Sequence, residues 1–193
     1  MLDNLRKYKI LLASKSPRRR ELLSELRIPF NVVSIGGIDE TYPDTLPCDE
    51  IPQYLANKKA DVYISTLKGE ELVITADTLV ILDGEVLGKP HGHEEAEAML
   101  ARLSGKVHKV VTGVCVSTRM KRITFSTVTE VKFADLSAED ITYYVENFLP
   151  FDKAGAYGIQ EWIGCVAVEW IKGSFYNVMG LPVHQLFTVL KTF

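Results

Sequence analysis

Strand-like and helix-like segments alternate along almost the whole chain, and this alternation restricts the possible folds more than any other feature of the sequence. Short runs rich in Val, Ile and Leu are followed by stretches in which apolar residues recur every three or four positions. Such alternation is typical of an α/β domain, in which helices cover a sheet. We therefore expect an α/β fold. Because no linker, repeat or low-complexity stretch interrupts residues 1–193, we expect a single domain.

Turn and capping residues separate the expected strands from the expected helices. The predicted strands are residues 9–13, 30–34, 72–76, 79–82, 85–87, 107–118, 122–133 and 166–172. The predicted helices begin after Ser16, span about 51–66, end at Ser104-Gly105, begin after Ser137 and span 183–190. Asp83-Gly84 predicts a two-residue hairpin turn, because both residue types tolerate the positive φ angles that such a turn needs.

Charge and cysteine usage restrict the classes of partner. The 193 residues carry a formal net charge of −3, which argues against a broad basic surface for nucleic acid or an anionic membrane. No apolar run reaches the length of a membrane span, and the first residues lack the pattern of a secretory signal. The three cysteines are too few for a disulfide framework, and we expect Cys115 and Cys165 to be buried. These features predict a cytoplasmic protein without nucleic-acid or membrane partners.

Hydroxyl and basic residues fill the junction between the first predicted strand and the first predicted helix, where Ser16 is placed as the N-cap and Pro17 as the first helical residue. Backbone N–H groups at such a helix N-terminus attract anions, and the Ser14 and Ser16 hydroxyls add further donors. Arg18 and Arg19 add guanidinium groups that match phosphate geometry. Solvated arginines on a capped helix are the alternative. The helix dipole disfavours basic residues there and a bound anion would offset that cost, which favours a phosphate site.

Carboxylates and lysines elsewhere in the chain supply the other groups that phosphate hydrolysis needs. Asp77 follows the predicted strand 72–76, at the kind of position where α/β sheets bind ligands, and is a candidate proton acceptor and metal ligand. Asp39-Glu40, in the loop after the second predicted strand, offers a second carboxylate for a divalent metal. Lys59 and Lys89 are candidates to reach phosphate groups. Each of these residues, taken alone, is more often a turn, cap or surface residue.

Other common catalytic motifs are absent from the sequence. His91 and His93 have no further histidine near them before His108, which argues against a metal site there. The chain contains no GxGxxG or Walker sequence, and no GxSxG segment that would support a serine nucleophile.

Taken together, these segments resemble the Maf-like family of nucleotide pyrophosphatases. The resemblance covers nearly the whole chain in the right order, and although single pieces are weak, the ordered set is specific. The matching segments are Ser14-Lys15-Ser16-Pro17-Arg18-Arg19, Asp39-Glu40, Leu55-Ala56-Asn57-Lys58-Lys59-Ala60, Thr75-Ala76-Asp77-Thr78, Leu87-Gly88-Lys89-Pro90, Val111-Thr112-Gly113, Lys153-Ala154-Gly155-Ala156-Tyr157-Gly158-Ile159-Gln160 and Gly173-Ser174-Phe175-Tyr176-Asn177.

The resemblance implies an elongated mixed β-sheet flanked by helices, two lobes around a deep cleft, and a homodimer. It also implies hydrolysis of a nucleoside triphosphate between the α- and β-phosphates with a divalent metal, Mg²⁺ or Mn²⁺. Asp77 matches the catalytic acid of the family, which accepts the proton of the attacking water, and with Glu40 it is expected to bind the metal. The remaining implied residues are polar residues of the cleft (Ser14, Arg19, Lys59 and Lys89) and residues associated with substrate choice (Arg18, Thr78 and Gln160).

Thr78 together with Gln160 resembles the branch of the family that acts on dTTP and UTP. The Gln160 amide offers both a donor and an acceptor, which suits the imide edge of thymine or uracil. Many members carry glycine after this glutamine, whereas this chain has Glu161. The alternatives are a nucleotide-binding regulator of cell division without significant catalysis, and a pyrophosphatase that prefers 7-methyl-GTP or ITP. House-cleaning of the nucleotide pool and division control both stay open as the purpose.

Overall fold

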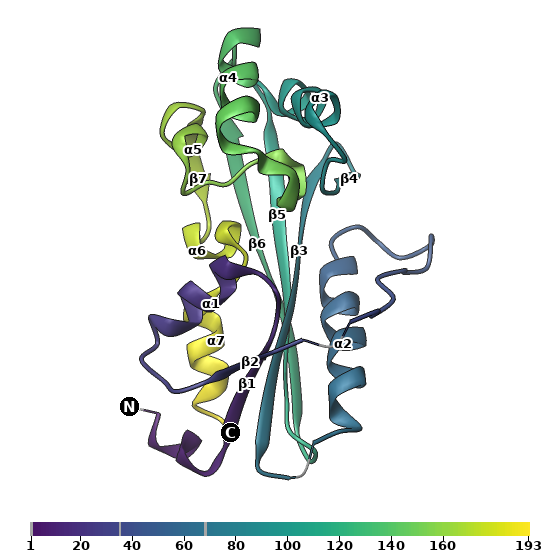
Figure 1. Cartoon of the computed structure of the whole chain (residues 1–193), viewed down its shortest axis with the longest axis vertical. Helices are drawn as coiled ribbons and strands as arrows, with labels where there is room; N and C mark the ends of the chain where they lie inside the picture. Colours follow the sequence, from purple (N-terminus) through teal and green to yellow (C-terminus); the bar gives the residue numbers. More distant parts are fainter. Residues whose placement is uncertain (1, 35, 68) are drawn as a thin grey trace. The chain divides into compact units, whose positions relative to one another are not determined.

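Seven strands in the described part of the chain form one mixed sheet, in the order β2-β1-β3-β5-β6-β7 with β4 beside β3 (Figure 1). The structure, a computed structural model, describes residues 2–34, 36–67 and 69–193. The strands are β1 (Lys9–Ala13), β2 (Asn31–Val33), β3 (Glu71–Leu82), β4 (Glu85–Leu87), β5 (Val107–Ser117), β6 (Arg122–Phe133) and β7 (Val168–Lys172). β1 is parallel to β2 and β3, whereas the β3–β4 and β6–β7 pairs are antiparallel. The predicted α/β class with a mixed sheet is confirmed.

Helices fill most of the connections between these strands. They are α1 (Pro17–Ser24), α2 (Ile51–Ile64), α3 (His93–Leu103), α4 (Ala138–Phe148), α5 (Trp162–Val166), α6 (Phe175–Met179) and α7 (Val183–Leu190), with 3₁₀ turns η1 (Asp3–Lys7), η2 (Pro150–Asp152) and η3 (Ala154–Ala156). Each helix that periodicity predicts is present, whereas α5, α6 and the 3₁₀ turns are too short to show a hydrophobic period. None of the described helices is long and apolar enough to cross a membrane.

Capping and turn residues fix several of these boundaries as predicted. Ser16 accepts a hydrogen bond from the backbone N–H of Arg19, and Pro17 is the first residue of α1. Asp83 and Gly84 take positive φ angles of 52° and 83° between the antiparallel strands β3 and β4, which is the backbone geometry that a two-residue hairpin requires. Ser137 begins α4 with a reciprocal capping box.

The predicted strands 72–76 and 79–82 are a single strand, β3, so the expectation that Asp77 follows a strand is wrong. Asp77 lies in the middle of β3, which spans twelve residues. β1 pairs with β3 only as far as Leu12 opposite Ile74, because β1 ends at Ala13. The carboxylate therefore lies just beyond the carboxyl end of the neighbouring parallel strand rather than beyond the end of its own.

The predicted strand 166–172 is also too long at its start, because Val166 is the last residue of α5. Helical spacing places Ile163 and Ala167, four residues apart, on a buried face. Cys165 lies between them in sequence and is exposed, so its predicted burial is wrong, whereas Cys115 is buried as expected. The apolar run is amphipathic with a helical period, but it is too short for that period to be recognised in the sequence.

The chain divides into two compact units, each assembled from separate stretches of sequence. Unit 1 comprises Met1–Asp77, Thr112–Thr127 and Gly180–Phe193, and unit 2 comprises Thr78–Val111 and Val128–Met179. In unit 2, α3 and α4 contact each other, and their buried residues, such as Leu100 and Tyr144, share one apolar cluster. The single domain over residues 1–193 and the deep cleft implied by the resemblance stay predictions.

In unit 1, polar contacts at regular spacings hold α2 in register with β6. Side chains four residues apart on α2 bond side chains two residues apart on β6: Gln53 with Ser126, Asn57 with Thr124, and Asp61 with Arg122. Four helical residues rise about 6 Å and two strand residues rise about 6.6 Å, so the two rows of side chains stay aligned. α2 also passes directly over Gly113 of β5, where a Cβ would lie 2.3 Å from the backbone nitrogen of Gln53. These contacts fix the position of α2 along β5 and β6, and none of them involves a predicted catalytic residue.

Candidate active site

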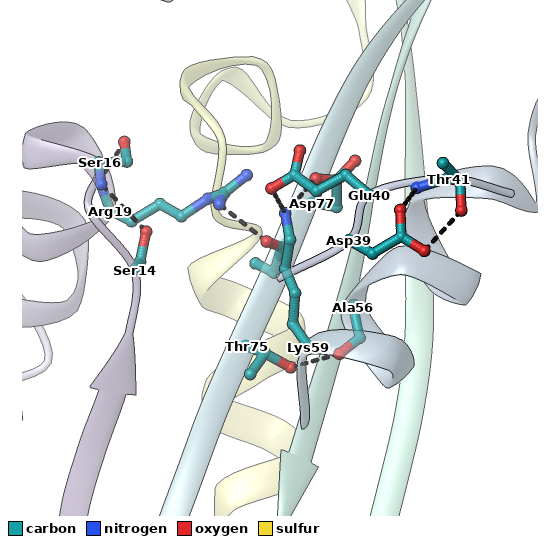
Figure 2. Close-up of polar contacts among 11 residues, drawn as sticks. Ser14, Ser16, Arg19, Asp39, Glu40, Thr41, Ala56, Lys59, Thr75 and Asp77 are labelled. Carbon is teal, nitrogen blue, oxygen red and sulfur yellow. Dashed lines mark hydrogen bonds and ion pairs between the residues drawn. The ribbon is translucent and has the colours of Figure 1, made fainter. Parts of the chain in front are cut away.

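One ammonium group joins two carboxylates in unit 1 (Figure 2). Lys59 Nζ lies 2.7 Å from Asp77 Oδ1 and 3.0 Å from Glu40 Oε1. The side chains of Lys59 and Asp77 are only 13% and 11% exposed, whereas that of Glu40 is 60% exposed. Because the three residues come from α2, β3 and the loop after β2, folding brings together groups that lie far apart in the sequence. The arrangement is one buried ion pair with a second carboxylate at its open side.

Matched spacings on α2 and β3 place Lys59 opposite Asp77. The Thr75 hydroxyl donates a hydrogen bond to the carbonyl of Ala56 at 2.7 Å. Asp77 follows Thr75 by two residues, so both lie on the same face of β3. Lys59 follows Ala56 by three residues, so it lies one turn further along the same face of α2. The Thr75 contact therefore sets the register in which the lysine meets the carboxylate.

Ser14 and Ser16 organise the junction between β1 and α1. Ser14 Oγ accepts the backbone N–H of Ser16 at 3.1 Å, and Ser16 Oγ accepts the backbone N–H of Arg19 at 3.4 Å. Two of the backbone donors that the sequence suggests for phosphate are thus used within the junction. Each hydroxyl acts as an acceptor in these bonds and keeps its own proton for donation.

Arg19 donates hydrogen bonds to two backbone carbonyls, and Figure 2 shows one of these bonds. Its Nε donates to the carbonyl of Gly180 at 2.9 Å, and its Nη1 donates to the carbonyl of Ala76 at 2.8 Å. Because Ala76 immediately precedes Asp77, the second bond fixes the backbone that carries the carboxylate. Arg19 therefore holds the backbone of the site through its own hydrogen bonds. The sequence predicts only phosphate binding for this residue and does not indicate this positioning role.

The charged groups of unit 1 act on one another electrostatically. Burial lowers the pKa of the Arg19 guanidinium below its usual value, Asp77 opposes that shift, Arg18 adds to it, and Glu40 opposes it. Arginine stays charged under all ordinary conditions because its usual pKa is so high. Arg18 and the two carboxylates are thus all close enough to act electrostatically on Arg19.

Asp39 and Glu40 are adjacent in sequence but take different partners. Asp39 Oδ2 accepts hydrogen bonds from Lys58 Nζ at 2.8 Å and from the Thr41 hydroxyl at 2.7 Å. These bonds, that of Lys58 above all, lower the pKa of Asp39 to about 2. Of this acidic pair, only Glu40 contacts Lys59. The structure therefore brings Glu40 and not Asp39 to the buried ion pair.

Three of the predicted site residues, Thr78, Lys89 and Gln160, belong to unit 2. Thr78 follows Asp77 in β3, so the two side chains lie on opposite faces of the strand. Lys89 is exposed, two residues after the end of β4. Gln160 is exposed in the turn that precedes α5.

Sequence reasoning missed Thr75 and the surroundings of Gln160. Thr75 stands two residues before an acid in a buried strand, and that spacing is a signal for a shared face. Lys153 bonds Glu161 with a side chain that is only 8% exposed, and Tyr144 donates its hydroxyl proton to the same carboxylate. The presence of Glu161 next to Gln160 is the sequence signal for these surroundings, since a buried lysine needs an anionic partner.

The carboxylates of unit 1 fit a magnesium-type site completed by substrate. In the described residues, no group of three or more His, Cys, Asp or Glu side chains is placed to hold a metal ion. Mg²⁺ is usually held by one or two protein carboxylates, with water and substrate phosphate oxygens as the other ligands. Glu40 and Asp77, whose oxygens share one ammonium, supply such a pair. The site therefore offers cations for phosphate, carboxylates for a divalent metal and a carboxylate acceptor for a proton.

The chain is similar in sequence and in fold to known proteins. The model of a family described as Maf-like protein matches residues 9–193. The chain is 59% identical over 191 residues to a protein of Phocaeicola vulgatus named dTTP/UTP pyrophosphatase, with 99% of both chains covered. It is 56% identical over 193 residues to a protein of Parabacteroides distasonis with the same name, with 100% of both covered.

A solved structure extends the likeness in fold. The HAM1 protein of Coxiella burnetii superposes with a TM-score of 0.51 at 17% identity, over 96% of this chain and 100% of that one. At this identity the likeness concerns the fold alone. The family model and the full-length relatives together show that this chain belongs to the Maf-like protein family.

Proposed function

We propose that this chain hydrolyses dTTP and UTP to the nucleoside monophosphate and pyrophosphate. The observation that carries the proposal is the Lys59 ammonium, which lies 2.7 Å from Asp77 and 3.0 Å from Glu40 in a largely buried position. A lysine and two carboxylates at one point supply the charge stabilisation and the proton acceptor that phosphoanhydride hydrolysis needs. The full-length relatives named dTTP/UTP pyrophosphatase support the choice of substrate.

In this proposal the triphosphate binds to cationic groups and to hydroxyl donors at the start of α1. Arg18, Lys59 and Lys89 neutralise the phosphate oxygens, and the hydroxyls of Ser14 and Ser16 donate to them. Arg19 contributes its charge while it holds the backbone beside Asp77. Most of the rate enhancement then comes from positioning and from charge stabilisation.

Glu40 and Asp77 would hold a divalent metal, Mg²⁺ or Mn²⁺, in this proposal. Carboxylate oxygens are the protein ligands that these ions prefer, and the exposure of Glu40 leaves one side of the pair open to substrate. When bound, the metal supplies charge neutralisation at the phosphate oxygens.

Asp77 acts as the general base. Its carboxylate takes a proton from a water molecule as the water oxygen forms a bond to the α-phosphorus. The bond between the α-phosphorus and the bridging oxygen breaks, and pyrophosphate leaves with the electron pair of that bond. Lys59 and the Arg19–Ala76 bond hold the carboxylate in place during this step.

Gln160 and Thr78 together recognise the nucleobase of the substrate.

The test is pyrophosphate release from a panel of nucleotides by the wild type and by Asp77→Asn. The panel contains dTTP, UTP, 5-methyl-UTP, CTP, GTP, 7-methyl-GTP and ITP, each with Mg²⁺ and with Mn²⁺. We expect dTTP and UTP to be the best substrates and the variant to lose roughly 100-fold or more in rate, the usual scale for a general base. Asp83→Asn, at an exposed hairpin position, is the matched control and should retain wild-type turnover.

Three outcomes separate the alternatives. Turnover of 7-methyl-GTP or ITP alone would support the proposed reaction and reject dTTP and UTP as its substrates. Wild-type rates in Asp77→Asn would reject Asp77 as the general base. Binding of nucleotides without any hydrolysis, with either metal, would favour the regulator of cell division.

We further propose that the enzyme is a homodimer, as the family resemblance implies, and that it is cytoplasmic, as its cysteine usage favours. Sedimentation equilibrium of the purified chain tests the assembly, and fractionation of the producing cells tests the location. A monomer at micromolar concentration would reject the dimer.

A further inference from the structure

Gln160 lies in a tight turn that its neighbours hold closely. The backbone N–H of Glu161 donates to the carbonyl of Gly158 at 2.9 Å, so Ile159 and Gln160 occupy the two central positions of the turn. Gly164 of α5 packs against the same turn, because a Cβ there would lie only 1.7 Å from the carbonyl oxygen of Ile159. The exposed Gln160 side chain is thus presented from a fixed backbone.

Both carboxylate oxygens of Glu161 are held by groups from the interior of unit 2. Tyr144 donates its hydroxyl proton to Glu161 Oε2 and accepts the backbone N–H of Gly158 at 3.0 Å. Lys153 Nζ lies 3.1 Å from Glu161 Oε1. Tyr144 is fully buried, and the side chain of Lys153, which also bonds Asp152 Oδ1 at 2.8 Å, is 8% exposed, so both partners of Glu161 are enclosed by the protein. The Glu161 carboxylate is therefore a fixed acceptor at the side of the turn.

The same carboxylate and the amide nitrogen of Gln160 both lie beside Gly158. A Cβ built on Gly158 would lie 2.9 Å from Gln160 Nε2 and 3.0 Å from Glu161 Oε2, so both atoms border one small space that only glycine leaves open. An ionised carboxylate accepts hydrogen bonds and cannot donate them. It attracts the amide NH₂ and repels the amide oxygen, and this difference selects one of the two orientations of the amide.

We propose that Glu161, held by Tyr144 and Lys153, is a specificity-determining residue that orients the Gln160 amide with its nitrogen inward and its carbonyl oxygen outward. The inference rests on the proposed function, in which Gln160 reads the base. An outward carbonyl accepts the N3–H of uracil or thymine. The N3 atom of cytosine carries no proton, so it is itself an acceptor and is repelled by the carbonyl oxygen. The fixed orientation therefore favours UTP over CTP.

The test compares UTP and CTP in the wild type, Glu161→Gln and Tyr144→Phe, with Tyr143→Phe as control. A glutamine at 161 has an acceptor and a donor in the same place, so it no longer selects one orientation of the Gln160 amide. Tyr144→Phe keeps the ring, which stacks on Phe148, and removes the hydroxyl that bonds both Glu161 and the backbone N–H of Gly158. Tyr143 is the neighbouring residue on α4 and is 48% exposed.

Two readouts keep this inference separate from the proposed function. Pyrophosphate release shows whether UTP is a substrate at all, and equilibrium binding of UTP and CTP to the Asp77→Asn protein gives the ratio of their affinities. We expect that ratio to fall about tenfold in Glu161→Gln, as for one lost hydrogen bond to the base, and by a smaller factor in Tyr144→Phe. In the active enzyme the change should lie in the KM for UTP with kcat nearly unchanged. Tyr143→Phe should match the wild type.

Unchanged affinity ratios in Glu161→Gln and Tyr144→Phe would overturn the inference. An equal loss for UTP and CTP would overturn it as well, because such a loss marks a structural role without influence on the base. Circular dichroism and thermal unfolding of each variant identify any loss that comes from misfolding, and Tyr144→Phe then decides the question, since it preserves the packing of the core.

Discussion

His108 lies inside the core of unit 2, and we expect it to make the stability of the protein depend on pH. Its Nε2 is 2.8 Å from the Tyr157 hydroxyl, and its ring makes edge contacts with Phe133 and Tyr157. Its Nδ1 has no hydrogen-bond partner among the described residues. The residue is only 2% exposed, and its burial lowers the pKa of His108 from 6.5 to about 4.

The sign and size of the effect follow from the two pKa values. Between pH 6.5 and pH 4 the unfolded chain binds a proton at His108 that the folded chain does not bind. The free energy of unfolding therefore falls as the pH falls, and the contribution of His108 is fully present only above pH 6.5. With about 1.36 kcal/mol per pKa unit, the loss is about 2 kcal/mol at pH 5 and about 3 kcal/mol at pH 4.

Urea unfolding of the wild type and of His108→Gln at pH 8 and pH 5 measures this contribution. Glutamine can bond the Tyr157 hydroxyl but does not titrate, so the variant should be less stable at both pH values while losing less between them. We expect the wild-type free energy of unfolding to fall by about 2 kcal/mol more than that of the variant. Other titrating groups are common to both proteins and cancel in this difference. Equal losses in the two proteins would refute the assignment of the pH dependence to His108.

Three further substitutions test how unit 1 is held together. Lys59→Met removes the ammonium between the two carboxylates, and we expect at least about 100-fold lower kcat/KM for every nucleotide in a pyrophosphate-release assay, with part of it restored in Lys59→Arg. Thr75→Val removes the hydrogen bond to α2 with little change in shape. It should lower the free energy of unfolding, measured with urea, by about 1–2 kcal/mol and lower kcat about tenfold. An unchanged kcat would reject the role of Thr75 in setting the register of α2 against β3. Gly113→Ala adds a methyl group 2.3 Å from the backbone of α2, and its melting temperature should fall by the equivalent of about 1–3 kcal/mol; a wild-type melting temperature would show that the helix can shift freely.

The elements that the sequence predicts well are those with local causes. Ser137 and Asp140 satisfy each other's backbone groups within one turn, so the start of α4 is visible in four residues. Asp83-Gly84 makes a hairpin turn by its own φ preferences. The predicted burial of Cys165 is wrong because the five residues of α5 carry too little pattern to show which side of the helix faces the core.

The partners of the charged residues depend on contacts that no local pattern contains. Lys58 and Lys59 are neighbours of the same type, yet one bonds Asp39 in the loop and the other bonds Asp77 in the sheet. The phase of α2 decides between them, because the buried Ala56 places the third residue after it, rather than the second, on the inner face. The sequence contains that phase, but only the fold shows that Asp77 is what the inner face meets.

The proposed chemistry and the proposed selectivity fall on different units of the chain, and this separation makes them distinguishable by mutation. Asp77 ends the first stretch of unit 1, and Thr78, the next residue of β3, begins unit 2. Glu40 and Lys59 belong to unit 1, whereas Gln160 and the groups that hold its turn belong to unit 2. Substitutions at the ion pair of unit 1 should therefore slow all nucleotides by a common factor. Substitutions around the turn of unit 2 should change the ratio between UTP and CTP, because the base is the only part of the substrate in which these two nucleotides differ.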